Sequence, residues 1–389
     1  MITPLLLAAA AQALSPSLGP SDHREHRARL ASAIENGVVW LEGAKEDDDA
    51  RFLQDPDFWW LSGVTAPDAA LLLTIKSGRI TKETLYLQPR NALNERWNGP
   101  RLGPDDRDAA RQTGFSEVVA LDKESRAAAL KINARAADGG HTNGDSAFRR
   151  ILDRLQVSKS PAEMAIQEHV LEVTMDSHLE AWKEVRPDNG EWQVEAAMEA
   201  GFRKRGSHDT AFASIVGSGP NTCYLHYRAN ERQMKAGELV VIDVGAQFNY
   251  YCADITRTVP VSGRFNKRQA EIYEIVLEAQ QKAIDAVRPG ITMRDVHKVA
   301  ADHIASKGYS KNFVHSTSHW LGLLVHDTGT FRGVLEPGMV LTVEPGIYIP
   351  EEDLGVRIED VVVVTKEGGR LLTARLPRTI KELEAALRR

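Results

Sequence analysis

Apolar and polar positions predict alternating helices and strands over residues 24–155. HREHRARLASAIENG (23–37) predicts a helix that ends at Gly37, and residues 108–131 predict a helix, a strand and a helix. Three apolar runs predict further strands: GVVWLEG (37–43), AALLLTI (69–75) and ETLYLQP (83–89). This order of elements indicates an α/β domain, which we assign to residues 21–157.

A long helix is predicted to open the second part of the chain. Ser160 is a suitable N-cap, Pro161 fits the first turn and Glu163 completes a capping box. Further helices are predicted at about 190–205, from Asn266 to 288–290, from Thr292 to Gly308, and from about 379; strands are predicted at 210–217, 239–259, 339–349 and 355–365. Long helices with antiparallel hairpins predict an α+β domain over residues 158–389.

The N-terminus allows two interpretations. PLLLAAAAQAL (4–14) has the length of the apolar part of a signal peptide, and Ala11 and Ala13 are spaced as at a cleavage site. MITP carries no Lys or Arg, which signal peptides normally have there. Residues 1–20 are therefore either a signal peptide, with a periplasmic or secreted protein, or an extension of a cytoplasmic one. The run is too short to span a bilayer, and we expect no membrane segment elsewhere.

The overall composition is that of a soluble globular protein, with 42% hydrophobic and 26% charged residues. Lys and Arg number 48 and Asp and Glu 54, a net charge of −6 that argues against a nucleic-acid partner. The two cysteines, Cys223 and Cys252, form no CxxC pair. A disulfide scaffold and a thiolate zinc site are therefore not expected.

Two aspartates interrupt a segment that otherwise predicts buried strands, VVIDVGAQFNYYCADITRTV (240–259). If the hairpin turns at Phe248–Asn249, Asp243 and Asp254 face each other with Cβ atoms about 5 Å apart. Facing carboxylates repel and are costly to bury in an apolar setting. A pair of divalent cations about 3.5–4 Å apart removes this cost and needs bridging carboxylates.

A second segment, VLTVEPGIYIPEEDLGVRIEDVVVV (340–364), repeats this arrangement. A loop centred on Glu351–Glu352 places Glu344 opposite Glu359, although Pro345-Gly346 would interrupt the first strand. A single acid of this kind is more simply a solvated charge at a strand edge. Four acids at matched positions on two apolar hairpins favour a metal site.

Histidines supply further candidate ligands. HSTSHWLGLLVHD (315–327) contains His315, His319 and His326; the glutamate of the helical zinc-protease motif is missing, and Gly322 favours a strand or loop. Four carboxylates with one imidazole suit Mn(II) better than structural zinc. His226 follows a Gly-Ser-Gly-Pro-Asn turn, on what we expect to be an apolar strand, and it is alternatively a buried, hydrogen-bonded histidine.

These segments together resemble the metallopeptidase family that contains methionine aminopeptidase, prolidase and aminopeptidase P, whose catalytic domain has the pita-bread fold. The resemblance rests on VIDVGAQFNYYCADITRTVPVSGRF, HSTSHWLGLLVHD, LEPGMVLTVEPGIYI and GVRIED. It runs from about residue 25 to the C-terminus. It is closest to bacterial aminopeptidase P, an Xaa-Pro aminopeptidase, because residues 55–73 resemble the N-terminal domain of that enzyme and residues 94–103 its substrate-capping segment.

The resemblance implies roles for individual residues. The implied ligands of two divalent metal ions are Asp243, Asp254, His319, Glu344 and Glu359. His226, His326 and Arg357 match positions around the metals that contact substrate, and His315 matches a histidine that lines the site. Trp97 matches an aromatic residue that reaches into a neighbouring subunit's site, which implies a homo-oligomer, either a dimer or a tetramer. The sequence departs from the family at Ser316 and Thr317, since a glycine more often follows the first histidine of HSTSH.

The implied reaction is the release of the first residue from a peptide with proline in second position, by a hydroxide that bridges the two metals. We expect Glu344 to transfer the proton, Asp243 with one metal to anchor the α-amino group, and His226 and His326 to stabilise the oxyanion and the peptide carbonyl. Simpler interpretations are a structural His326, an Arg357 that pairs with Glu359, and a Trp97 buried in a core.

Three other functions share this fold. A prolidase, which cleaves only Xaa-Pro dipeptides, would use the same ligands, so the metal site cannot separate the two activities. A non-catalytic peptide-binding module and a metal-free amidinohydrolase of the creatinase type would both lack the carboxylates that this chain retains.

Overall fold

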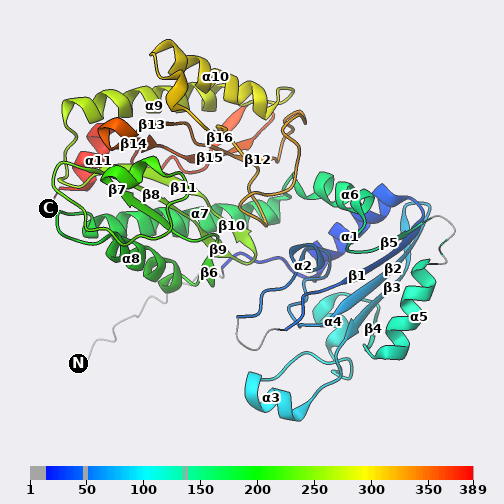
Figure 1. The fold of residues 1–389 in the computed structure, drawn as a ribbon. Helices are drawn as coiled ribbons and strands as arrows, with labels where there is room; N and C mark the ends of the chain where they lie inside the picture. The colour runs from blue at the N-terminus through cyan, green and yellow to red at the C-terminus, as the bar shows by residue number, and fades with distance from the viewer. Residues whose placement is uncertain (1–14, 47–50, 135, 137–138, 389) are drawn as a thin grey trace, which may run out of the picture.

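The computed structural model describes residues 15–46, 51–134, 136 and 139–388 (Figure 1). The apolar run at 4–14, which allows either a signal peptide or an N-terminal extension, lies outside these ranges. Within them, every helix is too short or too polar to cross a bilayer.

A five-stranded sheet forms the centre of the N-terminal domain, in the order β4-β3-β2-β1-β5 (Figure 1). Neighbours are antiparallel except β3–β4 and β1–β5, which are parallel. Its strands are β1 Gly37–Glu42, β2 Ala70–Lys76, β3 Arg79–Leu87, β4 Glu117–Ala120 and β5 Gly140–His141. Its helices are α1 Pro20–Ile34, α2 Pro56–Ser62, α3 Ala92–Asn98, α4 Ala109–Thr113, α5 Lys123–Ala134 and α6 Ser146–Gln156.

Helices cover both faces of this sheet, which explains the unbroken apolar strands. Val39 and Leu41 of β1 pack in the main core, whereas Val38 and Trp40 pack in a smaller cluster with Ala129 of α5. The predicted helices and strands of this domain are present. The sequence analysis did not predict α2, α3, α6 and β5.

The C-terminal domain is α+β, as predicted, with α7 and α8 on one side of its strands and α9 and α10 on the other (Figure 1). Its helices are α7 Pro161–Ala181, α8 Glu191–Lys204, α9 Lys267–Ala286, α10 Met293–Ser306 and α11 Ile380–Ala386, with 3-10 turns η1 Trp182–Glu184, η2 Gly219–Cys223, η3 Ser310–Asn312 and η4 Pro350–Glu352. Its strands are β6 Asp209–Thr210, β7 Ile215–Ser218, β8 Leu239–Val244, β9 Ala246–Phe248, β10 Tyr251–Cys252, β11 Ile255–Pro260, β12 Val340–Val343, β13 Gly346–Ile349, β14 Leu354–Arg357, β15 Asp360–Val364 and β16 Gly369–Leu371.

The junction between the domains lies between the end of α6 at Gln156 and the start of α7 at Pro161. The predicted capping box of Ser160 and Glu163 is present. Glu163 also joins the domains, because Oε1 accepts from Trp60 Nε1 at 2.8 Å and from Tyr251 Oη at 2.7 Å. The exact boundary at 157/158 stays a prediction.

The register predicted for the first hairpin is wrong by two residues. Asp243 lies opposite Thr256, not Asp254. The turn falls at Asn249–Tyr250, whose φ angles of 44° and 68° are both positive, and such turns match the twist of the flanking strands. An even shift keeps every side chain on the same face of the sheet, so Asp243 and Asp254 still point into one cavity.

The second hairpin has the predicted register. Val343 lies opposite Asp360 and Gly346 lies opposite Arg357, which places Glu344 across from Glu359. The first strand is interrupted between β12 and β13, at Glu344-Pro345. Proline has no N–H to donate to a neighbouring strand.

Candidate metal centre

Nine of the predicted site residues line one cavity of about 610 Å³ in the C-terminal domain. Five come from the two hairpins, and three come from the loop between η3 and β12, which is irregular as expected apart from isolated bridges at Trp320, Val334 and Met339. The nine are His226, Asp243, Asp254, His315, His319, His326, Glu344, Arg357 and Glu359. The tenth, Trp97, lies outside the cavity on α3.

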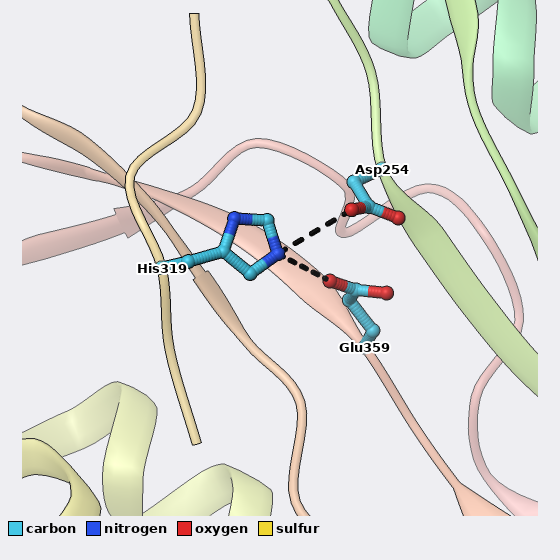
Figure 2. A group of neighbouring side chains, drawn as sticks. All are labelled: Asp254, His319 and Glu359. Atoms are coloured by element: carbon cyan, nitrogen blue, oxygen red, sulfur yellow. Dashed lines mark ion pairs between the residues drawn. The ribbon is translucent and has the colours of Figure 1, made fainter. Parts of the chain in front are cut away.

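The imidazole of His319 points at a group of carboxylates. Its Nε2 lies 3.4 Å from Oδ2 of Asp254, 3.5 Å from Oε1 of Glu344 and 3.9 Å from Oε1 of Glu359. Figure 2 shows Asp254, His319 and Glu359 converging from the first hairpin, the loop and the second hairpin. His319 Nδ1 lies 3.0 Å from the Trp320 carbonyl, so Nδ1 is the donor to this carbonyl and Nε2 is the ring atom that faces the carboxylates.

These residues fit a divalent cation. Asp243 Oδ1, Asp254 Oδ1 and Glu359 Oε1 are buried without a hydrogen-bond partner among the described residues. One ligand atom each of Asp254, His319 and Glu359 lie within 4.8 Å of one another. Buried carboxylate oxygens without donors are unfavourable, and oxygen ligands with one imidazole are the set that hard divalent ions prefer.

The protein alone holds these acids in an unfavourable state. Burial raises the pKa of Asp254 well above its usual range, and the charges of Asp243 and Glu344 raise it further. The pKa of Glu359 is raised in the same way, by burial first and then by Asp254 and Glu344. A bound cation would reverse this effect by favouring the ionised form.

Arg357 holds Asp243 rather than Glu359, so the simpler interpretation from sequence was wrong. Its Nη2 donates to Asp243 Oδ2 at 2.6 Å, and its Nη1 donates to Tyr348 Oη at 2.9 Å. Glu359 instead accepts from the hydroxyl of Thr256 at 2.8 Å.

The sequence analysis did not identify Thr256 and Tyr348. Thr256 of β11 lies two residues after Asp254, which directly precedes this strand, and this spacing could have revealed it.

The remaining histidines line the walls of the cavity. His315 Nε2 lies 2.9 Å from Tyr348 Oη, and burial followed by the charge of Arg357 lowers its pKa to about 4. The His326 ring packs edge-on against His319, with centroids 4.4 Å apart. His226 is exposed in a turn after η2. The sequence analysis expected it on an apolar strand, with a buried, hydrogen-bonded histidine as the alternative, and both interpretations were wrong.

The unusual residues of HSTSH take two different positions. Ser316 lines the cavity. Thr317 is fully buried, and its Oγ1 lies 2.9 Å from Nδ1 of His297 on α10. This contact attaches the loop between η3 and β12, which carries His315, His319 and His326 and is called the histidine loop below, to α10.

Trp97 is not a core residue. Its exposed fraction is 81%, and α3 has no buried residue. The interpretation of Trp97 as a buried aromatic was therefore wrong.

Comparisons with known proteins identify the family. Residues 166–366 match Metallopeptidase family M24, and residues 23–137 match the family Aminopeptidase P, N-terminal domain. The chain is 34% identical to Xaa-Pro aminopeptidase from Haemophilus influenzae, over 86% of this chain and 88% of that protein. It is 39% identical to Xaa-Pro dipeptidase from Pyrococcus furiosus, over 57% of this chain and 65% of that protein.

A solved structure agrees over both domains. Aminopeptidase P from E. coli with the inhibitor Pro-Leu superposes with a TM-score of 0.84 at 29% identity, covering 95% of this chain and 98% of that one. The chain therefore belongs to metallopeptidase family M24 and carries the N-terminal domain of aminopeptidase P.

Proposed function

We propose that this protein is a dinuclear metal-dependent aminopeptidase that releases the N-terminal residue from peptides with proline in second position. The observation that carries the proposal is the convergence of one imidazole and four buried or half-buried carboxylates on one cavity. The relatives with this activity match the chain along both domains. A non-catalytic binding module has no need for such a complete donor set.

The proposed metal ligands are Asp243, Asp254, His319, Glu344 and Glu359, and the proposed metal is Mn(II). When bound, the two ions supply a water of lowered pKa and a Lewis acid for the scissile carbonyl. The choice of Mn(II) rests on the hard, oxygen-rich set of donors.

The chain's own residues have separate tasks in this reaction. The side chain of Glu344 is 17% exposed, compared with 2% for Glu359, so its carboxylate reaches the cavity and can take the proton of the attacking water. Glu344 then returns the proton to the proline nitrogen. Asp243, fixed by Arg357, anchors the α-amino group of the substrate.

His226 and His326 donate hydrogen bonds to the developing oxyanion and to the peptide carbonyl. Both line the cavity and are solvent-accessible, so a peptide can reach them. His315, held by Tyr348, contributes to the wall that contacts substrate.

Prolidase activity is the second candidate, and the N-terminal domain argues against it. The dipeptidase relative matches only 57% of the chain, whereas the aminopeptidase relative matches 86%. The test is to load the protein with Mn(II) and to follow an Xaa-Pro-Xaa tripeptide and an Xaa-Pro dipeptide in parallel.

Faster release of the first residue from the tripeptide supports the aminopeptidase, and preference for the dipeptide supports the prolidase. No cleavage by metal-loaded protein would overturn both. The control variant is Asp254→Ala: activity and metal content that persist in it would refute the proposed centre.

We also propose a homo-oligomer in which α3 reaches a second copy. Leu93 and Trp97 are 67% and 81% exposed and stand four residues apart, on one side of α3. In Figure 1, α3 projects from the edge of the N-terminal domain. A helix with no buried residue and two large exposed apolar side chains needs a partner surface.

The location of the protein in the cell is a separate proposal. We propose two alternatives. Either residues 1–14 are a signal peptide that is cleaved when the protein is exported, or they are retained and the protein is cytoplasmic. N-terminal sequencing of the mature protein distinguishes these outcomes.

A further inference from the structure

A buried ion pair contains Asp327, the residue after His326, which is also among the residues that line the cavity. Lys159 Nζ is 2.9 Å from Oδ2 of Asp327, and both side chains are only 1% exposed. Nζ also donates to the Val157 carbonyl at 3.2 Å. Lys159 belongs to the junction between α6 and α7, whereas Asp327 belongs to the histidine loop. The pair therefore connects the domain junction to the wall of the cavity.

The backbone around both partners is fixed. Lys159 N donates to the Gly338 carbonyl at 2.9 Å, just before β12. Asp327 N donates to the Trp320 carbonyl at 3.0 Å, which closes residues 320–327 into a loop. His319 lies immediately before this closed loop and His326 lies at its end, so the geometry of the loop sets the distance between the two imidazoles.

Close packing requires glycine beside the pair. A Cβ atom at Gly322 would overlap Oδ2 of Asp327 and would lie 2.7 Å from Nζ of Lys159. The Gly322 carbonyl accepts from Cys252 N at 2.7 Å, two residues before Asp254. The loop is thus held on one side by the first hairpin and on the other by Lys159.

His326 has no anchor of its own. No hydrogen bond of its ring joins it to any part of the chain that the structure describes, and its ring contact is with His319. Its position therefore depends on the backbone of residues 326–327, which the ion pair secures.

We propose that Lys159 and Asp327 are positioning residues that hold His326 at the substrate-binding site. This inference rests on the proposed peptidase function. A displacement of about 1 Å at a group that contacts substrate can cost about 10²-fold in rate. In this proposal the pair acts through His326: Asp327 belongs to the cavity lining, but the charged side chains of both partners are only 1% exposed.

Kinetics of full-length, Mn(II)-loaded variants test the proposal. Asp327→Asn keeps the shape of the side chain and removes its charge, and we expect a kcat about 10- to 100-fold lower on an Xaa-Pro-Xaa tripeptide with unchanged metal content. In a His326→Ala background, Asp327→Asn should lower kcat by less than about threefold, because the imidazole that the pair is proposed to position is already absent. Equal losses in both backgrounds would overturn the proposal.

The double variant Lys159→Met/Asp327→Asn separates positioning from stability. It leaves no unpaired buried charge, so its Tm should return toward that of the wild type while its kcat stays low. Recovery of kcat together with Tm would show that the pair does not position His326. The control is Arg27→Met, which breaks the buried Arg27–Glu83 pair of the N-terminal domain and should lower Tm without changing kcat.

Hydrogen exchange gives a readout that does not depend on catalysis. In Asp327→Asn, the amides of residues 320–327 should exchange at least about tenfold faster, since the loop loses its anchor. Unchanged exchange would overturn the positioning role even if activity fell. Failure of the wild-type protein to cleave the peptide would instead refute the proposed function.

Discussion

Arg357 donates to Asp243 over 2.6 Å across two different sheets, from β14 to β8. This contact places one cation among four carboxylates and leaves Oδ1 of Asp243 without a partner in the described chain, at the edge of the cavity. The guanidinium thus determines which oxygen of Asp243 faces a metal or an α-amino group.

Removal of this cation should impair catalysis strongly. Arg357→Met leaves Asp243 buried and unpaired, and we expect kcat/KM to fall about 10²- to 10³-fold. Arg357→Lys keeps the charge but loses the planar fork, so it should give an intermediate value. Steady-state kinetics with the tripeptide measures both. Wild-type kcat/KM in Arg357→Met would contradict a role for the pair.

Neutralising one ligand should have opposite effects on the metal-free and metal-loaded proteins. Asp254→Asn removes a charge from a group of repelling carboxylates, so the free energy of unfolding of the metal-free protein should rise by on the order of 1 kcal/mol. The metal-free variant should then unfold at a temperature a few degrees higher than the metal-free wild type. The rise in Tm on adding Mn(II) should be largely lost. Thermal scans with chelator and with Mn(II) test this. A lower Tm of the variant under both conditions would argue against a metal site.

Thr256 should tune metal affinity. Its hydroxyl donates to Oε2 of Glu359 and directs Oε1 toward His319. Thr256→Val keeps the shape and removes this donor, so Mn(II) affinity should fall about 10- to 100-fold. Competition with a chelator measures the affinity. The matched control is Thr84→Val: this buried threonine of the N-terminal domain donates to Oε2 of Glu117 at 2.6 Å, and its replacement should leave the affinity unchanged.

Acid should destabilise the fold through His178. Burial, followed by the charge of Arg257, lowers the pKa of this fully buried histidine to about 3, from 6.5. Between these two pKa values the unfolded chain therefore binds a proton that the folded chain excludes, which favours unfolding. The stability that neutral His178 provides is complete above pH 6.5 and is lost as the pH falls toward 3. Between pH 7 and 4.5 the loss is on the order of 2–3 kcal/mol.

The matching variant is His178→Gln, which retains a donor for the Ile255 carbonyl but cannot be protonated. Chemical denaturation at several pH values should show a shallower decline of stability in this variant. An identical pH dependence in variant and wild type would rule out His178 as the cause.

Substitution of Trp97 should change assembly without changing the fold. The side chain is 81% exposed, so Trp97→Ala should leave the free energy of unfolding of the isolated subunit within about 0.5 kcal/mol of the wild-type value. Sedimentation should show a smaller assembly, and activity on the tripeptide should fall. The control is Trp192→Ala, at an exposed tryptophan of α8. An unchanged assembly in Trp97→Ala would exclude the proposed contact.

Spacing along the sequence predicted the acidic site better than it predicted the turns. The second hairpin has the expected register, but the first is shifted because its turn includes Tyr250. Tyr250 has a positive φ, which is uncommon for a bulky residue, so the sequence did not indicate a turn at this position. The site survived this error because an even shift preserves the face of a strand. The exposure of Trp97 and the partner of Arg357 depend on tertiary contacts, which no local pattern encodes.

Two hairpins contribute two carboxylates each, and hydrogen bonds join the hairpins: the Glu359 amide donates to the Thr256 carbonyl at 3.0 Å, and the Arg357 amide donates to Thr258 Oγ1 at 3.1 Å. Neither hairpin alone can assemble the hydrolytic centre. A chain that is still being synthesised, or one that is unfolded locally at either sheet, therefore lacks an assembled site that could cleave peptides. During refolding, the recovery of peptidase activity should lag behind the recovery of helical signal and report the final docking of the two sheets.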